Sequence, residues 1–195
     1  MKHRIVLLFC ALCLCTVSGL RAVTVDQYTA GPSTGSVGFW GESFITPSSS
    51  AFNNIVFTFL TTGGANFASG TGFLLSAEYL GTPAGLSSST TGFLGQATAS
   101  GNLYTFTSGI TLNPNTTYYL YENISIPAGT IFGGGAGSPG RQFYYSATSA
   151  GNYGGSGGPA NFRVTGNAVP EPSTTALLLS AGLAGLFVVR RAKRS

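Results

Sequence analysis

The chain alternates apolar and polar residues over short stretches, and this pattern most constrains its fold. In residues 54–61, Ile55, Phe57 and Phe59 fall on one side of an extended segment, and residues 103–107 alternate similarly. Side chains along a β-strand point to opposite faces in turn, so the pattern predicts strands. No long helical period occurs before residue 175. The chain up to that point is therefore predicted to be all-β.

Eight segments have strand character: residues 37–45, 54–61, 72–80, 92–97, 103–107, 117–125, 141–148 and 161–165. Clusters of Gly, Pro, Ser and Asn separate them. Short strands with regular turn signals are typical of an antiparallel β-sandwich or jelly roll. Two glycine-rich stretches, residues 133–140 and 151–158, are expected to be surface loops.

The first 22 residues predict a secretory signal helix. A basic start, Met1 to Arg4, precedes an apolar stretch over residues 5–17 and then small residues. This order is typical of a signal peptide removed by signal peptidase. We expect the cut after Ala22, with Gly19 as an alternative, which makes residues 23–168 the exported domain.

The last 27 residues form a second targeting segment with three parts. The segment begins with an extended linker, continues with an uncharged apolar run over residues 175–189 and finishes with a basic end. The linker residues are Val169, Pro170, Glu171, Pro172 and Ser173, and the basic residues are Arg190, Arg191, Lys193 and Arg194. As a helix the apolar run is about 22 Å long at about 1.5 Å per residue, which is short for a membrane span. The basic end should stay cytoplasmic, so the helix is expected to hold the chain in the membrane before processing.

This three-part tail resembles the PEP-CTERM protein-sorting domain of Gram-negative bacteria. The resemblance rests on the Val-Pro-Glu-Pro-Ser linker, the apolar helix with Gly182 and Gly185, and the pair Arg190-Arg191. It implies cleavage near Pro-Glu-Pro by a membrane-embedded protease of the exosortase kind. It also implies delivery to the cell surface or extracellular matrix, in association with exopolysaccharide or biofilm material.

A weaker resemblance covers residues 36–165. The segment 110–120, Ile-Thr-Leu-Asn-Pro-Asn-Thr-Thr-Tyr-Tyr-Leu, is similar to a strand–turn–strand feature of exported bacterial β-sandwich modules. Such modules carry interchangeable C-terminal anchors. The resemblance implies no particular ligand.

Charge is concentrated at the two ends of the chain. The whole sequence has a net charge of +4, but residues 23–168 contain no Lys and only Arg141 and Arg163 as cations. The acidic residues there are Asp26, Glu42, Glu78 and Glu122. Nucleic-acid binding needs a basic patch that neutralises phosphates, so the composition argues against a nucleic-acid partner.

Residues 23–168 also contain neither His nor Cys. This excludes Ser-His-Asp and Cys-His catalysis and any His or Cys metal site there. The strings Gly-Pro-Ser-Thr-Gly at 31–35 and Gly-Ala-Gly-Ser-Pro-Gly at 135–140 match catalytic and dinucleotide-binding patterns, but neither has the helix that those motifs require. We therefore predict no catalytic residue, cofactor or metal. The four carboxylates leave a glycoside hydrolase or a Ca²⁺ site open as alternatives.

Aromatic residues give the best binding hypothesis. Trp40, Tyr119, Tyr121 and Tyr144 are candidates for stacking against sugar rings, although such residues also fill β-sheet cores. Adjacent pairs such as Tyr118-Tyr119 must point to opposite faces in a strand, so one member of each is expected outside the core. The sequence thus predicts a non-enzymatic exported protein associated with polysaccharide, with a carbohydrate-binding module as the alternative.

Overall fold

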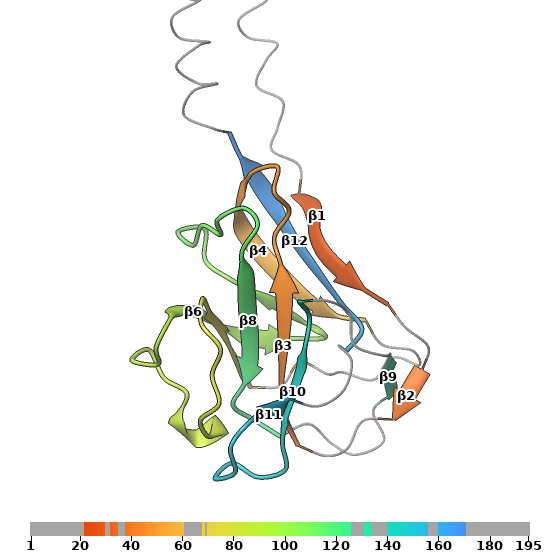
Figure 1. The fold of residues 1–195 in the computed structure, drawn as a ribbon, viewed down its shortest axis with the longest axis vertical. Helices are drawn as coiled ribbons and strands as arrows, with labels where there is room; N and C mark the ends of the chain where they lie inside the picture. The colour runs from red at the N-terminus through yellow and green to blue at the C-terminus, as the bar shows by residue number, and fades with distance from the viewer. Residues whose placement is uncertain are drawn as a thin grey trace, which may run out of the picture. The chain divides into compact units, whose positions relative to one another are not determined.

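The computed structural model describes residues 22–29, 32–34, 38–60, 68, 70–125, 131–133, 140–155 and 160–170. Ala22–Val169 forms one compact unit. Its regular structure in the described residues is β-strand, apart from one short 3-10 turn (Figure 1). The all-β prediction is confirmed. The predicted C-terminal helix and, apart from Ala22, the predicted signal helix lie outside the described residues.

The elements follow one another along the chain as short strands. They are β1 (Ala22–Tyr28), β2 (Pro32–Thr34), β3 (Phe39–Ile45), β4 (Ala51–Phe59), β5 (Thr71–Leu75), the 3-10 turn η1 (Pro83–Gly85), β6 (Phe93–Ser100), β7 (Leu103–Thr105), β8 (Thr117–Glu122), β9 (Ile131–Gly133), β10 (Phe143–Ser146), β11 (Gly154–Gly155) and β12 (Phe162–Val169). Each of the eight predicted segments overlaps one of these strands, although the bounds differ by several residues at some ends.

Ten of the strands form one antiparallel sheet in the order β1-β12-β4-β7-β6-β5-β8-β3-β10-β11, and β2 pairs separately with β9. Four strands were not predicted: β1, β2, β9 and β11. The pairing of β11 places Gly154 and Gly155 opposite Tyr145 and Tyr144, so part of an expected loop is a sheet edge. The predicted strand over residues 72–80 ends early, at Leu75, and residues 76–92 form a loop instead.

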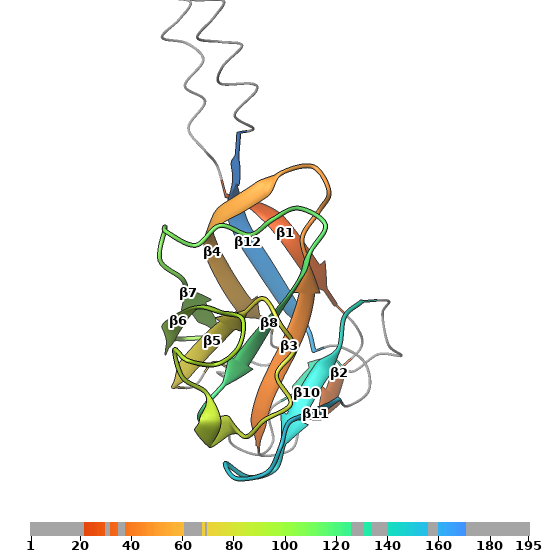
Figure 2. The same ribbon diagram turned by 60° about the vertical axis from the view of Figure 1, so that its left-hand side comes forward.

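The sheet folds over itself, so strands far apart in its order face one another. Phe44 on β3 lies 6.0 Å from Phe57 on β4 between ring centroids, and Trp40 lies 6.4 Å from Phe59. In Figure 1, β4 and β12 lie behind β3 and β8, and Figure 2 shows the same strands from another side. The hydrogen bonding nevertheless joins all ten strands in one sheet. The narrower assignment to a β-sandwich or a jelly roll stays a prediction.

The main core lies between the two facing halves of the sheet. The predicted alternation in β4 is confirmed, because Ile55, Phe57 and Phe59 are all buried there. Tyr118 and Leu120 of β8 point into the same core. Burying a large apolar side chain contributes about 1.5–3 kcal/mol, so these positions supply much of the stability of a domain without disulfides.

A second apolar cluster covers the outer face of β8, β3 and β10. Its buried members are Phe39, Phe73, Leu75, Leu86, Tyr121, Tyr144 and Tyr153. Tyr79 in the loop 76–92 packs on this cluster, with its ring centroid 5.8 Å from that of Tyr121. The loop therefore buries side chains that would otherwise face solvent.

Close packing explains one glycine within β3. A Cβ atom on Gly41 would lie 2.4 Å from Cδ1 of Tyr121 and 3.0 Å from the carbonyl oxygen of Leu120. Gly41 pairs with Tyr121 across the sheet, so the aromatic ring lies over the glycine. The absence of a side chain at this position lets the outer cluster close on the sheet.

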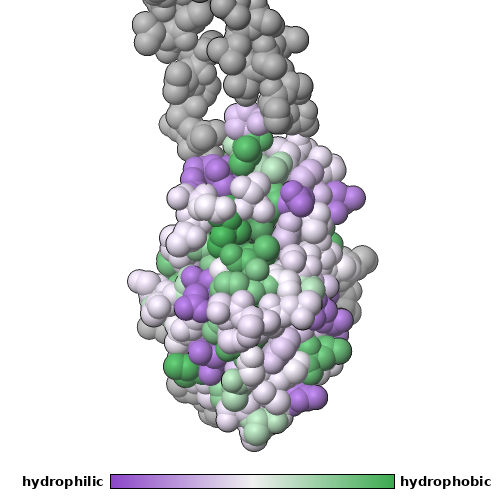
Figure 3. Space-filling model, turned by 90° about the vertical axis from the view of Figure 1, so that its left-hand side faces the viewer, coloured by the Kyte–Doolittle hydropathy of each residue, from purple (hydrophilic) through white to green (hydrophobic). Residues whose placement is uncertain are grey.

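The surface is poor in charge. The face in Figure 3 shows mostly residues of intermediate hydropathy, scattered hydrophilic ones and a central hydrophobic strip. The large hydrophobic residues exposed among the described residues are Val23, Leu80 and Ile124.

Candidate functional site

Two of the four carboxylates of the domain are buried in the core. Glu42 and Glu122 are both 0% exposed. Glu42 Oε2 accepts a hydrogen bond from the backbone N–H of Ala160 at 2.7 Å, and Glu122 Oε1 accepts one from the Tyr104 hydroxyl at 2.6 Å. Burial raises the pKa of Glu42 well above its usual range, although the Ala160 hydrogen bond opposes the shift. A substrate in solvent does not reach either group, which argues against a hydrolase built on this pair.

A third carboxylate, Asp26 on β1, forms an ion pair with Arg141, just before β10. The Arg141 Nη2 atom lies 2.6 Å from Asp26 Oδ1, and Nε lies 3.0 Å from Oδ2. Asp26 Oδ2 also accepts a hydrogen bond from the Ile45 N–H at 2.8 Å. The Asp26 hydrogen bond is the main cause of the raised pKa of Arg141. This pair joins β1, at one end of the sheet order, to the region of β3 and β10 near the other end.

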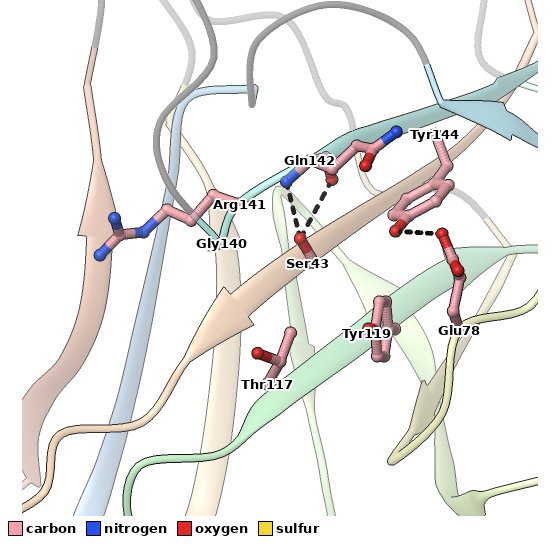
Figure 4. Close-up of a pocket in the computed structure, with 8 residues that line it drawn as sticks. All are labelled: Ser43, Glu78, Thr117, Tyr119, Gly140, Arg141, Gln142 and Tyr144. Carbon is pink, nitrogen blue, oxygen red and sulfur yellow. Dashed lines mark hydrogen bonds between the residues drawn. The ribbon is translucent and has the colours of Figure 1, made fainter.

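The fourth carboxylate, Glu78, lines a pocket of about 250 Å³. Residues from β3, β8, the loop 76–92 and the start of β10 contribute to it (Figure 4). The lining residues are Ser43, Glu78, Thr117, Tyr119, Gly140, Arg141, Gln142 and Tyr144. The pocket lies beside the outer cluster, because Tyr144 is a member of that cluster and Tyr119 packs against it.

Hydrogen bonds of the loop 76–92 place Glu78 at the pocket. The backbone N–H of Tyr79 donates to the Tyr121 hydroxyl at 3.1 Å, and the Tyr79 hydroxyl donates to the Thr82 carbonyl at 3.0 Å. Glu78 Oε1 then accepts a hydrogen bond from the Tyr144 hydroxyl at 2.9 Å. The position of the Glu78 carboxylate is therefore set by its hydrogen bond with Tyr144 and by the hydrogen bonds of the next residue, Tyr79.

The opposite wall is fixed by hydrogen bonds between β3 and Gln142, the residue before β10. The Gln142 N–H donates to Ser43 Oγ at 2.7 Å, and the Ser43 N–H donates to the Gln142 carbonyl at 3.0 Å. The Gln142 side chain is exposed. Its amide is a donor and an acceptor that a ligand at the pocket rim can use.

Two tyrosine hydroxyls line the pocket and keep their protons at neutral pH. Burial raises the pKa of Tyr119, and the negative charge of Glu78 adds to the shift. Burial also raises the pKa of Tyr144, and donation to Glu78 raises it further. Both hydroxyls therefore remain hydrogen-bond donors.

The four residues predicted to stack on sugar rings have different positions in the structure. Trp40 and Tyr121 are 0% exposed, so neither ring can meet a ligand, and the expectation is wrong for them. Trp40 faces the main core, where its ring meets Phe143 edge-on at 5.5 Å, and Tyr121 is covered by the loop 76–92. Tyr144 is 2% exposed but lines the pocket. Tyr119 is partly exposed and is the one of the four whose ring remains accessible.

Sequence reasoning did not identify the pocket itself. From the sequence, Glu78 is a candidate only for a hydrolase carboxylate or a Ca²⁺ ligand, and nothing in the sequence marks Ser43, Thr117 or Gln142 as site residues. These residues meet through strand register and a loop, and no local sequence pattern marks either. One sequence signal was useful: neighbouring residues of a strand point to opposite faces, which predicted that one of Tyr118 and Tyr119 would lie outside the core. Tyr118 is buried in the main core and Tyr119 faces the pocket.

The described residues contain no group of three or more Asp, Glu, His or Cys side chains able to hold a metal ion. Of the string at 31–35, Pro32–Thr34 forms β2, paired with β9, and not the strand–turn–helix of a nucleophile elbow. The hydrolase and Ca²⁺ alternatives thus gain no support from the part of the chain that the structure describes.

The sheet ends where the predicted linker begins. Val169, the last residue of β12, pairs with Ala51, and Pro170 follows it. Proline has no N–H to donate to a ladder, which is consistent with the strand ending there. Glu171, Pro172, Ser173 and the basic residues Arg190, Arg191, Lys193 and Arg194 lie outside the described residues. Among the residues described, no helix is long and apolar enough to cross a membrane, and the predicted membrane helix over residues 175–189 is not among them.

Comparison with known proteins identifies the tail. A family model described as the PEP-CTERM protein-sorting motif matches residues 168–194. No curated protein and no solved structure matches the chain. The match supports the prediction from the linker, apolar run and basic end, and it indicates an exported protein sorted through exosortase. The resemblance of residues 36–165 to modules with interchangeable anchors stays a prediction.

Proposed function

We propose that the protein is a non-enzymatic component of the cell surface or extracellular matrix, and that it contacts polysaccharide through the pocket of Tyr119, Tyr144 and Glu78. The pocket is the observation that carries this proposal. It combines one accessible aromatic ring with fixed polar groups, an arrangement suited to a ligand with apolar faces and hydroxyl edges.

The route to that location follows from the two ends of the chain. Signal peptidase removes residues 1–22, and the apolar helix over residues 175–189 holds the chain in the inner membrane. A protease of the exosortase kind then cuts near Pro170 and Pro172. The sorting-motif match at residues 168–194 supports the exosortase step of this route.

We also propose that the folded-over sheet is a β-sandwich. Ring contacts between β3 and β4 support this assignment, since these strands face one another without sharing hydrogen bonds. A sandwich leaves the outer face of β8 and β10 available for the loop 76–92 and the pocket beside it.

Binding to a panel of neutral and acidic bacterial polysaccharides tests the proposed function. Tyr119→Ala removes the accessible ring and should weaken binding about ten-fold or more, whereas Tyr119→Phe keeps the ring and should retain most of the affinity. Tyr28→Ala, at a partly buried tyrosine that is not among the pocket-lining residues, is the matched control. Absence of binding across the panel, or equal binding by Tyr119→Ala and the unmodified protein, contradicts the proposal.

Mass spectrometry of the C-terminus of the protein recovered from the cell surface tests the route separately. We expect peptides that end near Pro-Glu-Pro. Recovery of mature protein that still carries residues 190–195 would contradict processing.

A further inference from the structure

The charges of the domain are few, and all of them are placed by the structure. Residues 22–169 contain six charged side chains: Asp26, Glu42, Glu78, Glu122, Arg141 and Arg163. All six lie in described residues, and the internal stretches outside them contain no Asp, Glu, Lys, Arg or His. The electrostatic character of the pocket can therefore be read from these six groups.

Neither cation is directed at a ligand in the pocket. Arg141 lines it, but its Nε and Nη2 atoms both donate to the Asp26 carboxylate, at 3.0 Å and 2.6 Å. Figure 4 shows the guanidinium pointing away from Tyr119, Tyr144 and Glu78. The bidentate face that would recognise a ligand carboxylate or sulfate is thus occupied by the protein's own carboxylate. Arg163 on β12 is not among the lining residues and donates to Gln27 at 2.9 Å.

The carboxylate of Glu78 is different, because its hydrogen-bond donor is neutral. The Tyr144 hydroxyl at 2.9 Å orients it without cancelling its charge. The close-up shows the Glu78 carboxylate, the Tyr144 hydroxyl and the Tyr119 ring gathered at the same end of the pocket (Figure 4). That end therefore presents a negative, hydrogen-bond-accepting group beside the one accessible ring.

We infer that the pocket selects saccharides that carry hydroxyl donors and no acid group, with Glu78 accepting from those hydroxyls and repelling uronic-acid or sulfate groups. This inference rests on the proposed polysaccharide contact and names the class of ligand. Glu78 is exposed, and a ligand acid group beside it would bring two like charges to within a few ångströms, where they repel each other. A hydroxyl edge would instead give charge-assisted hydrogen bonds, which are about twice as strong as neutral ones.

Matched polysaccharide pairs test the inference. We would measure binding of the full chain, purified in mild detergent, to dextran and dextran sulfate, hydroxyethyl and carboxymethyl cellulose, and agarose and carrageenan, at a constant salt concentration of about 0.15 M to limit long-range charge effects. We expect at least one neutral member to bind, and to bind ten-fold or more tightly than its acidic partner. Preference for the acidic member would overturn the inference and leave the polysaccharide contact standing. No binding to any member would count against the proposed function itself.

The variant Glu78→Gln keeps the size of the side chain and removes its charge. We expect it to weaken binding of the neutral member about ten-fold and to reduce the discrimination between the two members about ten-fold. Arg163→Gln, a charge change outside the pocket, should alter neither quantity. Unchanged discrimination in Glu78→Gln would overturn the role assigned to Glu78. Fluorescence of Trp40, the one Trp of the chain, checks that each variant is folded.

Discussion

The ion pair between Asp26 and Arg141 should be a main support of the folded sheet, and Asp26→Asn is expected to lower the free energy of unfolding by about 3 kcal/mol. The Asp26 side chain is 4% exposed and accepts from the Gln27 N–H and the Ile45 N–H, both at 2.8 Å, as well as from Arg141. An asparagine offers one acceptor oxygen where the aspartate offers two. Removing one partner of a buried pair costs about 3–5 kcal/mol. Arg141 is 24% exposed and can be hydrated, so the lower end of that range applies.

Urea unfolding followed by Trp40 fluorescence measures this loss, because Trp40 is the one Trp of the chain and is 0% exposed in the main core. Arg163→Gln, which removes an exposed arginine with a single hydrogen bond to Gln27, should change stability by less than about 0.5 kcal/mol. In an Arg141→Gln background, Asp26→Asn should cost at least about 1 kcal/mol less than it does alone, because the two residues act together. A loss below about 1 kcal/mol for Asp26→Asn in the otherwise unmodified protein would refute the reasoning.

Three further changes can be measured by the same titration. Gly41→Ala should lower the free energy of unfolding by about 1–3 kcal/mol, because the new Cβ would lie 2.4 Å from the Tyr121 ring. Gly109→Ala is the control and should be close to neutral, because a Cβ there would have nothing within 4 Å. Equal effects of the two changes would contradict the packing argument. Leu112→Ala should cost about 2–5 kcal/mol, since Leu112 is 0% exposed, and a loss below about 1 kcal/mol would argue against its place in the core. Burial raises the pKa of Glu42 in the folded state, so the folded protein keeps the Glu42 proton to a higher pH than the unfolded chain does. The free energy of unfolding should therefore fall as the pH rises from the unfolded pKa of Glu42 through its folded pKa. Glu42→Gln should remove this contribution, which is at most about 1.4 kcal/mol per pH unit, and identical pH slopes in the two proteins would contradict it.

Strand positions were predictable because burial on one face leaves a period of two in the sequence. β4 and β8 show this most clearly, with Phe57 and Leu120 in the core and their neighbours facing the other way. The strands that were missed do not carry such a signal. β11 is two glycines, and the first three residues of β1 are exposed. Residues 76–80 looked like strand, but the Tyr79 N–H donates to a tyrosine hydroxyl and not to a neighbouring backbone.

The site was less predictable because it depends on what covers the outer face. Alternation places Tyr119 and Tyr121 on the same face of β8, so nothing local distinguishes them. The loop 76–92 covers Tyr121 and leaves Tyr119 partly exposed. Glu78 reaches the pocket through that same loop. A sequence pattern reports which face a residue is on, but it does not report which parts of that face a distant loop will bury.

The proposed processing would change the net charge of the protein from positive to negative. The net charge of +4 depends on the basic residues near the two ends of the chain, and residues 23–168 have two arginines against four carboxylates. One of those arginines is neutralised by Asp26, and two of the carboxylates are buried in the core. The ladder of β12 ends at Val169, so cleavage near Pro-Glu-Pro breaks no pairing of the sheet. Processing would therefore leave the fold unchanged and convert a basic precursor into a weakly acidic domain, whose exposed pocket charge is that of Glu78. Under the proposed function, the net negative charge of such a domain would not attract acidic polymers, and its contact with a matrix would come from hydroxyl recognition and ring packing.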